Sequence, residues 1–173
     1  ILGRAPYRNL EGDRRMPINY MTKKSYDSLS AEAKRLREVE IPKVSREKLE
    51  AAQQGDLREN AGYDAARDRL MLLGARLEQI VARISAARFI EELNVPGDIV
   101  SIGTRVRLLD LAAGGEVEYC VLGPADADIS RNVISFESPL AKGMISRRAS
   151  EEFSVETPGG ERRFRILSIE RYR

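Results

Sequence analysis

Apolar residues in the first half of the chain recur in alternating steps of three and four. From residue 63 to residue 87 they follow the a and d positions of a coiled coil for about three and a half heptads, and these positions hold Tyr63, Ala66, Leu70, Leu73, Leu77, Ile80, Ile84 and Ala87. An earlier stretch keeps the same rhythm at Tyr26, Leu29, Ala33 and Leu36 and resumes it less regularly, after Pro42, at Val44, Leu49 and Ala52. The pattern predicts two long helical arms, of which the first is kinked or loosely packed near Pro42.

A glycine break separates the two helical patterns. Gly55 is followed at once by Asp56, and Glu59 comes three residues later, which predicts a helical hairpin with an acidic tip at residues 55–60. At 1.5 Å per residue, an arm of about thirty residues would be roughly 50 Å long. That length exceeds what the core of one small domain needs, so we interpret the hairpin as a device that reaches a distant site.

After about residue 94 the pattern changes to short runs of alternating apolar and polar residues, several of them separated by Gly and Pro. The runs span residues 105–109, 116–122, 133–136, 152–156 and 163–169. Ser138 followed by Pro139 is typical of a helix start, which predicts a short helix over residues 138–145 against one face of a small, mostly antiparallel sheet. The predicted fold class is α+β, a long N-terminal antiparallel coiled-coil hairpin followed by a small sheet domain.

These patterns divide the chain into three segments. Residues 1–20 are polar, contain two prolines and lack periodicity, so we expect them to be disordered or weakly packed. Residues 21–93 form the hairpin and residues 97–173 the C-terminal domain. No apolar run is long enough for a transmembrane helix and no N-terminal segment resembles a secretion signal, so we expect a cytoplasmic protein without a membrane partner.

The residue types present narrow the possible chemistry. The chain has no histidine and one cysteine, which excludes Ser-His, Cys-His and histidine-zinc sites, and Cys120 in its strand-like run is interpreted as a structural thiol. Any chemistry must come from carboxylates, amines or a borrowed metal. The arms contain more Lys and Arg than Asp and Glu, which permits contact with a polyanion; the alternative is a solvated coiled-coil surface.

The two tip carboxylates have two interpretations. Asp56 and Glu59, three residues apart at a helix start, project from the same end of the hairpin and offer two hard oxygen donors to a Mg²⁺ that keeps most of its water. They do not form a complete metal site. Alternatively they cap the helix, with Asp56 accepting a backbone N–H and Glu59 favoured by the helix dipole.

Two motifs in separate domains resemble those of one family, the Gre transcript-cleavage factors, which are bacterial transcription elongation factors of the GreA/GreB class. The first is similar to the tip signature of that family and reads Gly55-Asp56-Leu57-Arg58-Glu59-Asn60-Ala61, with Tyr63 and Ala65-Ala66-Arg67 after it. The second contains Asn132, Ile134-Ser135 and Ser138-Pro139-Leu140-Ala141-Lys142-Gly143-Met144-Ile145, followed by Thr157-Pro158-Gly159-Gly160-Glu161. The resemblance runs from about residue 16 to residue 173.

The resemblance implies an FKBP-like fold for the C-terminal domain and a role on bacterial RNA polymerase. It implies that the coiled coil enters the secondary channel of the polymerase, where Asp56 and Glu59 help hold a Mg²⁺ in the polymerase's own active site. No cofactor is expected to bind tightly to the factor alone. Water activated by the metal would cleave the 3′ end of the nascent RNA in backtracked or arrested complexes. The factor would therefore not itself be an enzyme, and we expect a monomer.

The family motifs imply further site residues. The candidates for RNA contact or support of the tip are Arg58, Asn60, Tyr63, Arg67 and Arg69. Arginines in a coiled coil are ordinarily salt-bridge partners, and Tyr63 also lies on the seam, so packing is the alternative role. The candidates for polymerase binding are Ser138, Pro139, Leu140 and Lys142, and their alternative role is packing on the sheet. Gly62 stands where the family often has an acidic residue, and glycine within a helix costs about 1 kcal/mol relative to alanine.

Three rival functions stay open. The first is a Gre-like paralogue that occupies the channel and inhibits or modulates polymerase without cleavage, although this chain keeps both Asp56 and Glu59. The second is an FKBP-type peptidyl-prolyl isomerase with a coiled-coil appendage, which would need a cluster of aromatic side chains in the C-terminal domain. The third is a coiled-coil adaptor, for which the tip carboxylates would be dispensable.

Overall fold

The computed structural model of this chain describes residues 18–53, 60–157 and 160–173. Contacts divide the chain into two compact units. The hairpin unit is Lys24–Ala87, and the sheet unit joins Arg88–Arg173 to the described residues up to Lys23. Within the described residues, no helix combines the length and the apolar character that crossing a membrane requires.

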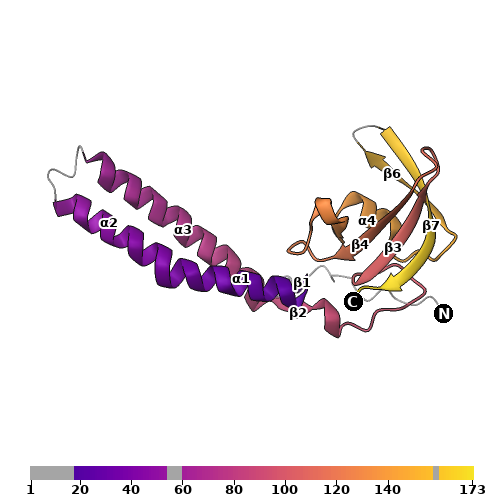
Figure 1. Cartoon of the computed structure of the whole chain (residues 1–173), viewed down its shortest axis with the longest axis horizontal. Helices are drawn as coiled ribbons and strands as arrows, with labels where there is room; N and C mark the ends of the chain where they lie inside the picture. Colours follow the sequence, from indigo (N-terminus) through magenta and orange to yellow (C-terminus); the bar gives the residue numbers. More distant parts are fainter. Residues whose placement is uncertain (1–17, 54–59, 158–159) are drawn as a thin grey trace, which may run out of the picture. The chain divides into compact units, whose positions relative to one another are not determined.

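The hairpin unit consists of two paired arms. The first arm contains α1 (Lys23–Arg35), a π-helical segment (Leu36–Glu40) and α2 (Ile41–Gln53), and the second is α3 (Ala61–Ser85). Figure 1 shows α2 and α3 running side by side. The side chains buried between the arms come from the predicted seam and are Ala33, Leu36, Val44, Ala66 and Ile80. The predicted helical hairpin is confirmed.

The interruption predicted at Pro42 takes the form of the π-helical segment. The Ile41 N–H donates to the carbonyl oxygen of Leu36, five residues earlier, and Pro42 has no N–H with which to continue an α-helical ladder. A π-helical turn contains more residues than an α-helical turn. The positions after Pro42 are therefore rotated relative to an uninterrupted repeat.

One of the predicted seam positions after Pro42 is wrong. Leu49, placed on the seam by its spacing, is 60% exposed, whereas its neighbour Lys48 is half-buried. The ammonium group of Lys48 lies over the ring of Tyr63, 5.1 Å from the ring centroid. A lysine thus occupies the place where the spacing predicts an apolar residue, and Leu49 faces solvent beside it.

Ion pairs along the arms support the antiparallel register. The guanidinium of Arg76 on α3 donates to both carboxylate oxygens of Glu32 on α1, at 2.8 and 3.1 Å. Nearer the tip, Arg69 on α3 lies 3.9 Å from Glu40 and 3.8 Å from Glu47. Exposed pairs of this kind contribute up to about 1 kcal/mol each, so burial of the seam supplies most of the association between the arms.

The sheet unit contains a five-stranded sheet in the order β5-β4-β3-β7-β6. The strands are β3 (Thr104–Asp110), β4 (Glu116–Leu122), β5 (Val133–Ser135), β6 (Glu152–Thr157) and β7 (Gly160–Arg171). All neighbours are antiparallel except β4 and β5, which are parallel. The predicted α+β fold class, with a mostly antiparallel C-terminal sheet, is confirmed.

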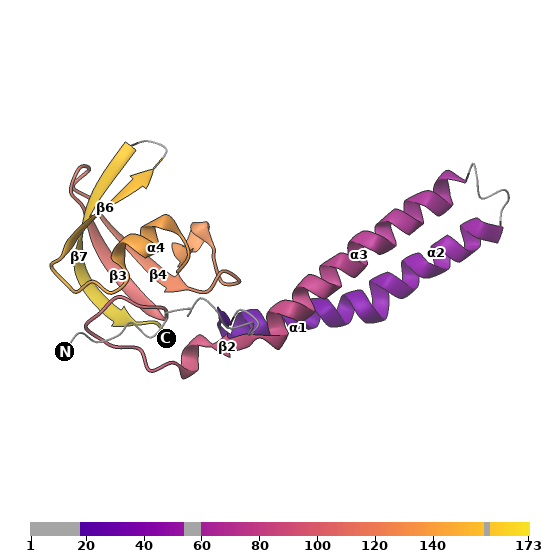
Figure 2. The ribbon, with the colours of Figure 1, turned by 180° about the vertical axis from the view of Figure 1, so that it is seen from behind.

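One face of this sheet is covered by α4 (Pro139–Met144). The cap predicted for this helix is present, because the Ser138 hydroxyl accepts a hydrogen bond from the Ala141 N–H at 3.3 Å. Ala141 and Met144 are fully buried in a core that includes β3 and β7. A Cβ at Gly143 would lie 3.0 Å from the ring of Phe153, so this glycine allows α4 to lie close to β6. Figure 2, which views the molecule from the opposite side to Figure 1, shows α4 against the sheet.

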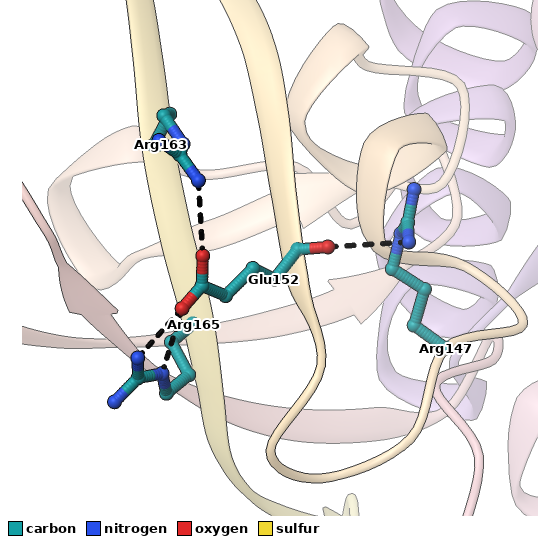
Figure 3. A network of polar contacts seen from close by, with 4 residues as sticks. All are labelled: Arg147, Glu152, Arg163 and Arg165. Carbon is teal, nitrogen blue, oxygen red and sulfur yellow. Dashed lines mark hydrogen bonds and ion pairs between the residues drawn. The ribbon is translucent and has the colours of Figure 1, made fainter.

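The strands β6 and β7 also carry a network of charged side chains, which Figure 3 shows at close range. The Glu152 carboxylate accepts hydrogen bonds from Arg165, at 2.6 and 3.1 Å, and from Arg163 at 3.1 Å. The bond from Arg165 is the main cause that lowers the pKa of Glu152. Arg147 donates to the backbone carbonyl of Glu152 at 3.2 Å, so the segment after α4 is tied to β6.

A second, two-stranded sheet pairs β1 (Asn19–Met21) with β2 (Ala87–Phe89). The Thr22 hydroxyl after β1 donates to the Asp126 carboxylate at 2.5 Å, and the Thr22 N–H donates to the same carboxylate. Residues 18–20 fall in the segment expected to be disordered, but Asn19 and Tyr20 belong to this strand. A strand of three residues is too short to show a period in the sequence. Residues 1–17 lie outside the described residues.

Gly123 is the position that leaves room for β1. A Cβ built at Gly123 would overlap the Tyr20 carbonyl oxygen. We therefore expect Gly123→Ala to displace β1 and to destabilise the sheet unit by about 1–3 kcal/mol, the usual cost of overpacking. Hydrogen exchange of the amides of residues 18–23 and thermal melting measure these two effects. Gly115→Ala is the control, because a Cβ there meets nothing within 4 Å. Equal exchange in both variants would contradict the assignment.

The contacts of Asp110, at the end of β3, indicate that the sheet unit loses stability in acid. Its carboxylate accepts from the N–H groups of Ala113 and Ala112 at 3.0 and 2.9 Å and pairs with Arg162. The Ala113 bond is the largest cause that lowers the pKa of Asp110, followed by Arg162. A lowered folded-state pKa means that the ionised group stabilises the fold above about pH 4 and loses this effect as the pH falls through the folded-state value.

We therefore expect Asp110→Asn to have a lower melting temperature than the parent at pH 7, with the difference shrinking below about pH 4. The measurement is thermal unfolding of the sheet unit as a function of pH. Glu161→Gln, an exposed acid on β7, is the control and should follow the parent throughout. A difference between Asp110→Asn and the parent that stays constant with pH would rule out this role of the carboxylate.

Candidate functional site

The candidate site lies where the two arms of the hairpin end. The first arm ends at Gln53 and α3 begins at Ala61. Three of the predicted tip residues, Asp56, Arg58 and Glu59, lie outside the described residues. The described residues on either side show how this end of the hairpin is built.

Asn60 connects the two arms at this end. Its side-chain oxygen accepts a hydrogen bond from the Tyr63 N–H at 3.1 Å, which makes Asn60 the N-cap of α3. Its side-chain nitrogen donates to the carbonyl oxygen of Ala51 in the last turn of α2 at 2.6 Å. Helix ends leave N–H and C=O groups without partners inside the helix. One amide side chain thus satisfies a group on each helix and fixes the separation of the two arms.

Gly62 follows in the first turn of α3. A Cβ at Gly62 would lie 3.4 Å from the Asn60 side-chain oxygen and 3.8 Å from the Ala51 Cβ, which are ordinary van der Waals contacts. No close packing therefore requires glycine here. Glycine within a helix costs about 1 kcal/mol relative to alanine, so Gly62 makes this turn less stable than alanine would.

Tyr63 lines a hollow between α2 and α3 next to these ends, which we call the tip groove. The tip groove has a volume of about 310 Å³ and is lined by Ser45, Lys48, Leu49, Ala52, Tyr63 and Leu70. The ammonium of Lys48 over the Tyr63 ring is a cation–π contact, which contributes about 0.5–1 kcal/mol at an exposed site. Tyr63 therefore packs at the seam and also lines a surface hollow.

The two described arginines that the sequence analysis assigns to RNA contact are paired with carboxylates. Arg67 lies 3.0 Å from both Asp64 and Asp68, and the hydrogen bond to Asp68, followed by the charge of Asp64, raises the pKa of Arg67. Arg69 lies within 4 Å of Glu40 and Glu47, as given above. Part of the positive charge near the tip is thus already balanced within the hairpin.

The residues assigned to polymerase contact differ in exposure. Pro139 and Lys142 are exposed on α4. Ser138 caps the helix, and Leu140 is half-buried and packs against the core of the sheet unit. The structure therefore leaves Pro139 and Lys142 as surface groups and gives Ser138 and Leu140 packing and capping contacts.

Ile129 is an exposed apolar residue that the sequence analysis missed. It begins a short 3-10 turn (Ile129–Arg131) and is 89% exposed. The turn is braced by the Asp128 carboxylate, which accepts from the Ser130 N–H at 3.0 Å and from the Ser130 hydroxyl at 2.6 Å. A lone apolar residue in a loop carries no periodic signal, so only the structure reveals it.

Other described parts of the chain offer no metal site. Within residues 18–53, 60–157 and 160–173, no group of three or more Cys, Asp or Glu side chains is placed to hold a metal ion. The expected Mg²⁺ ligands are Asp56 and Glu59, which lie outside these ranges.

Comparison with known proteins covers both units of the chain. Residues 19–89 match the family described as "Transcription elongation factor, N-terminal", and residues 95–171 match "Transcription elongation factor, GreA/GreB, C-term". A transcription elongation factor GreA from Pelobacter propionicus is 37% identical over 149 residues, which cover 86% of this chain and 94% of that protein. The GreA of Nitratidesulfovibrio vulgaris is 40% identical over 144 residues, with 83% and 88% covered.

Among solved structures, the chain is similar to the GreA factor homolog 1 (Gfh1) protein of Thermus thermophilus. The two are 27% identical, the alignment covers 89% of this chain and 99% of that one, and the TM-score is 0.41.

The double role of Asn60 leads to a prediction for the hairpin. Asn60→Ala removes the cap of α3 and the bond to Ala51, so we expect the free energy of unfolding of the hairpin to fall by about 1–2 kcal/mol. Asn60→Asp keeps the cap acceptor but loses the donor to Ala51, and should cost less. Urea unfolding followed by helical circular dichroism measures both. Gln79→Ala, at an exposed position of α3, is the control; a similar value for Asn60→Ala would refute the connection.

Proposed function

The chain belongs to the GreA/GreB family of transcription elongation factors, and from this premise we propose that it binds bacterial RNA polymerase and stimulates cleavage of the nascent RNA. The substrate is the 3′ end of RNA in a backtracked or arrested complex. The hairpin enters the secondary channel of the polymerase, and the phosphodiester bond is hydrolysed in the polymerase's own active site. The factor supplies metal ligands to that site and is not an enzyme by itself.

The observation that carries this proposal is the pair Asp56 and Glu59 within the tip signature of a complete two-part family match. Both carboxylates are present, three residues apart, between the two helical arms. Support also comes from the Asn60 side chain, which bonds to both arms at the point where they end. A connection of this kind holds the ends of the tip segment at a defined separation.

The chemistry of the two tip side chains fits Mg²⁺. Carboxylate oxygens are hard donors, and Mg²⁺ is usually held by one or two carboxylates together with water and phosphate oxygens. When bound between the factor and the polymerase, the ion would activate water for attack on the phosphodiester. Asp56 and Glu59 would hold and orient it, while the polymerase and the RNA would complete its coordination.

The sheet unit is proposed to dock on the polymerase. Pro139 and Lys142 are exposed on α4, and Ile129 stands on a braced turn of the same unit. An apolar residue held by a rigid turn loses little conformational freedom on binding, which favours its use as a contact. We expect the factor to act as a monomer in the cytoplasm.

The prolyl isomerase alternative is disfavoured by the positions of the aromatic residues. Phe153 and Phe164 stack at 5.6 Å between ring centroids and are 4% and 3% exposed, so they fill the core. Phe136 packs edge-on against Tyr20. The sheet unit has a surface hollow of its own, and none of the residues that line it is aromatic. They are Gly97, Arg105, Ile169, Glu170, Arg171 and Arg173. The non-cleaving paralogue is tested by the experiment below.

We expect Asp56→Asn with Glu59→Gln to lower stimulated RNA cleavage by about a hundredfold, because metal ligands are lost. The assay is cleavage in purified, backtracked bacterial elongation complexes with Mg²⁺, compared with the parent. Binding to the polymerase should be unchanged, because the docking surface is left intact.

The control for this pair is Asp64→Asn with Asp68→Asn, which removes two carboxylates from the first turns of α3. This variant should cleave within a few-fold of the parent. If the parent binds polymerase and does not stimulate cleavage, the chain is a non-cleaving paralogue. If both double variants lose activity equally, net charge rather than the tip pair is responsible.

A further inference from the structure

We infer that the tip groove binds one nucleotide of single-stranded RNA. This inference rests on the proposed function, which brings the nascent RNA to the end of the hairpin. The groove lies beside that end, because Ala52 is in the last turn of α2 and Tyr63 is in the first turn of α3. Three observations carry it: the lining of the groove, the charge of Lys48 and the size of the hollow.

The lining suits a nucleobase. Leu49, Leu70 and Ala52 provide apolar surface, and Tyr63 provides an aromatic ring. Leu49 is 60% exposed. Other apolar side chains of the hairpin, such as Met71 and Leu72, are also exposed, but Leu49 is the one of these that lines the groove. Proteins that bind single-stranded nucleic acid without sequence preference combine aromatic stacking surfaces with nearby positive charge. The tip groove has both within one hollow.

The charge of Lys48 is available to a phosphate. In the described part of the hairpin, the ammonium group of Lys48 has the Tyr63 ring as its partner and no carboxylate within ion-pair distance. Arg67 and Arg69 each pair with two carboxylates, so their charge is already balanced. Lys48 is the cation in the lining of the groove, and within the described residues it has no ion pair.

The cation–π contact also defines where the Lys48 side chain lies in the empty groove. While the groove is empty, the ammonium covers one face of the Tyr63 ring at 5.1 Å from the centroid. A bound base would displace it and stack on the ring, and the flexible lysine stem would carry the ammonium to the phosphate of the same nucleotide. Lysine suits this exchange, because its ammonium is a compact charge on four rotatable carbons.

The size of the groove favours a nucleotide over a protein partner. A volume of about 310 Å³ is at the small end of ligand sites, whereas a helix from a partner needs a longer apolar groove with several anchor positions. The alternative occupant is a side chain of the polymerase, and the second experiment below distinguishes it.

The first experiment uses the full chain without polymerase and a fluorescein-labelled hexamer of uridylate as the probe. We expect Lys48→Gln and Tyr63→Leu each to weaken binding about tenfold, while Tyr63→Phe and Lys48→Arg bind like the parent. Lys43→Gln, an exposed lysine of α2 outside the groove, is the matched control. Loss of one phosphate contact should also lower the slope of log affinity against log salt by about 0.7 in Lys48→Gln alone.

That change in slope separates a binding role from a structural one, because a merely weakened fold does not change the number of phosphate contacts. Circular dichroism of each variant verifies that the hairpin is folded. Absence of binding by the parent, or equal binding by Lys48→Gln and Lys43→Gln, would overturn the inference.

The second experiment places a photoreactive benzoylphenylalanine at Leu49 and irradiates the protein in backtracked elongation complexes. A crosslink to the RNA supports the nucleotide site, and a crosslink to polymerase protein alone overturns it. The two proposals fail separately. If the parent stimulates cleavage and Lys48→Gln binds the hexamer normally, the groove assignment is wrong and the proposed function stands. If the hexamer binds through Lys48 and Tyr63 but the parent does not cleave, the site stands and the cleavage function falls.

Discussion

Pairing of the two helical arms is the constraint on which the rest of the hairpin depends. A segment that joins two helices is held in place only if both of its ends are fixed, and the cost of fixing them falls on contacts outside the segment. The entropic cost of holding the two arms together is offset by the buried seam along α1, α2 and α3. At the end of the arms it is offset by the side chain of Asn60. Its side-chain amide donates to α2 and caps α3. Hydrogen bonds therefore connect the arms at the end where apolar packing stops.

The sheet unit is subject to a different constraint. Its six-residue helix α4 covers only one face of the sheet, so the other face must be stable in water. Strand alternation places Val106 and Leu108 on the covered face, while Arg107 between them faces the other way. On that second face the register sets unlike charges opposite each other, with Arg165 across from Glu152 and Arg107 across from Glu118. Charges paired across strands allow the uncovered face to stay in water without offering an apolar surface to other chains.

Most of the fold was predictable because it follows from repeated patterns. The strands β3 to β7, the Ser138 cap and the two arms all rest on several residues that agree with one another. Strand β1 was missed because three residues show no period. Leu49 was misplaced because it lies five residues after the buried Val44, whereas a helical seam advances by three or four. For the candidate site, the sequence marks Asn60 and Tyr63 through a family motif. The bond to Ala51 and the contact with Lys48 join residues from different arms, which linear spacing does not reveal.

The exchange of Leu49 and Lys48 has an electrostatic consequence for the tip. Lys48 stands four residues after the buried Val44 and so takes the seam position beside Tyr63, whereas a lysine that points into solvent would have its charge strongly screened. This placement puts the charge against an aromatic ring and leaves the apolar side chain of Leu49 at the surface. Within the described residues, Arg67 and Arg69 are balanced by acids on the hairpin itself, and Lys48 is not. A polyanion that approaches this end therefore finds uncompensated charge where aromatic and apolar surface is also open, so attraction and stacking act at one place.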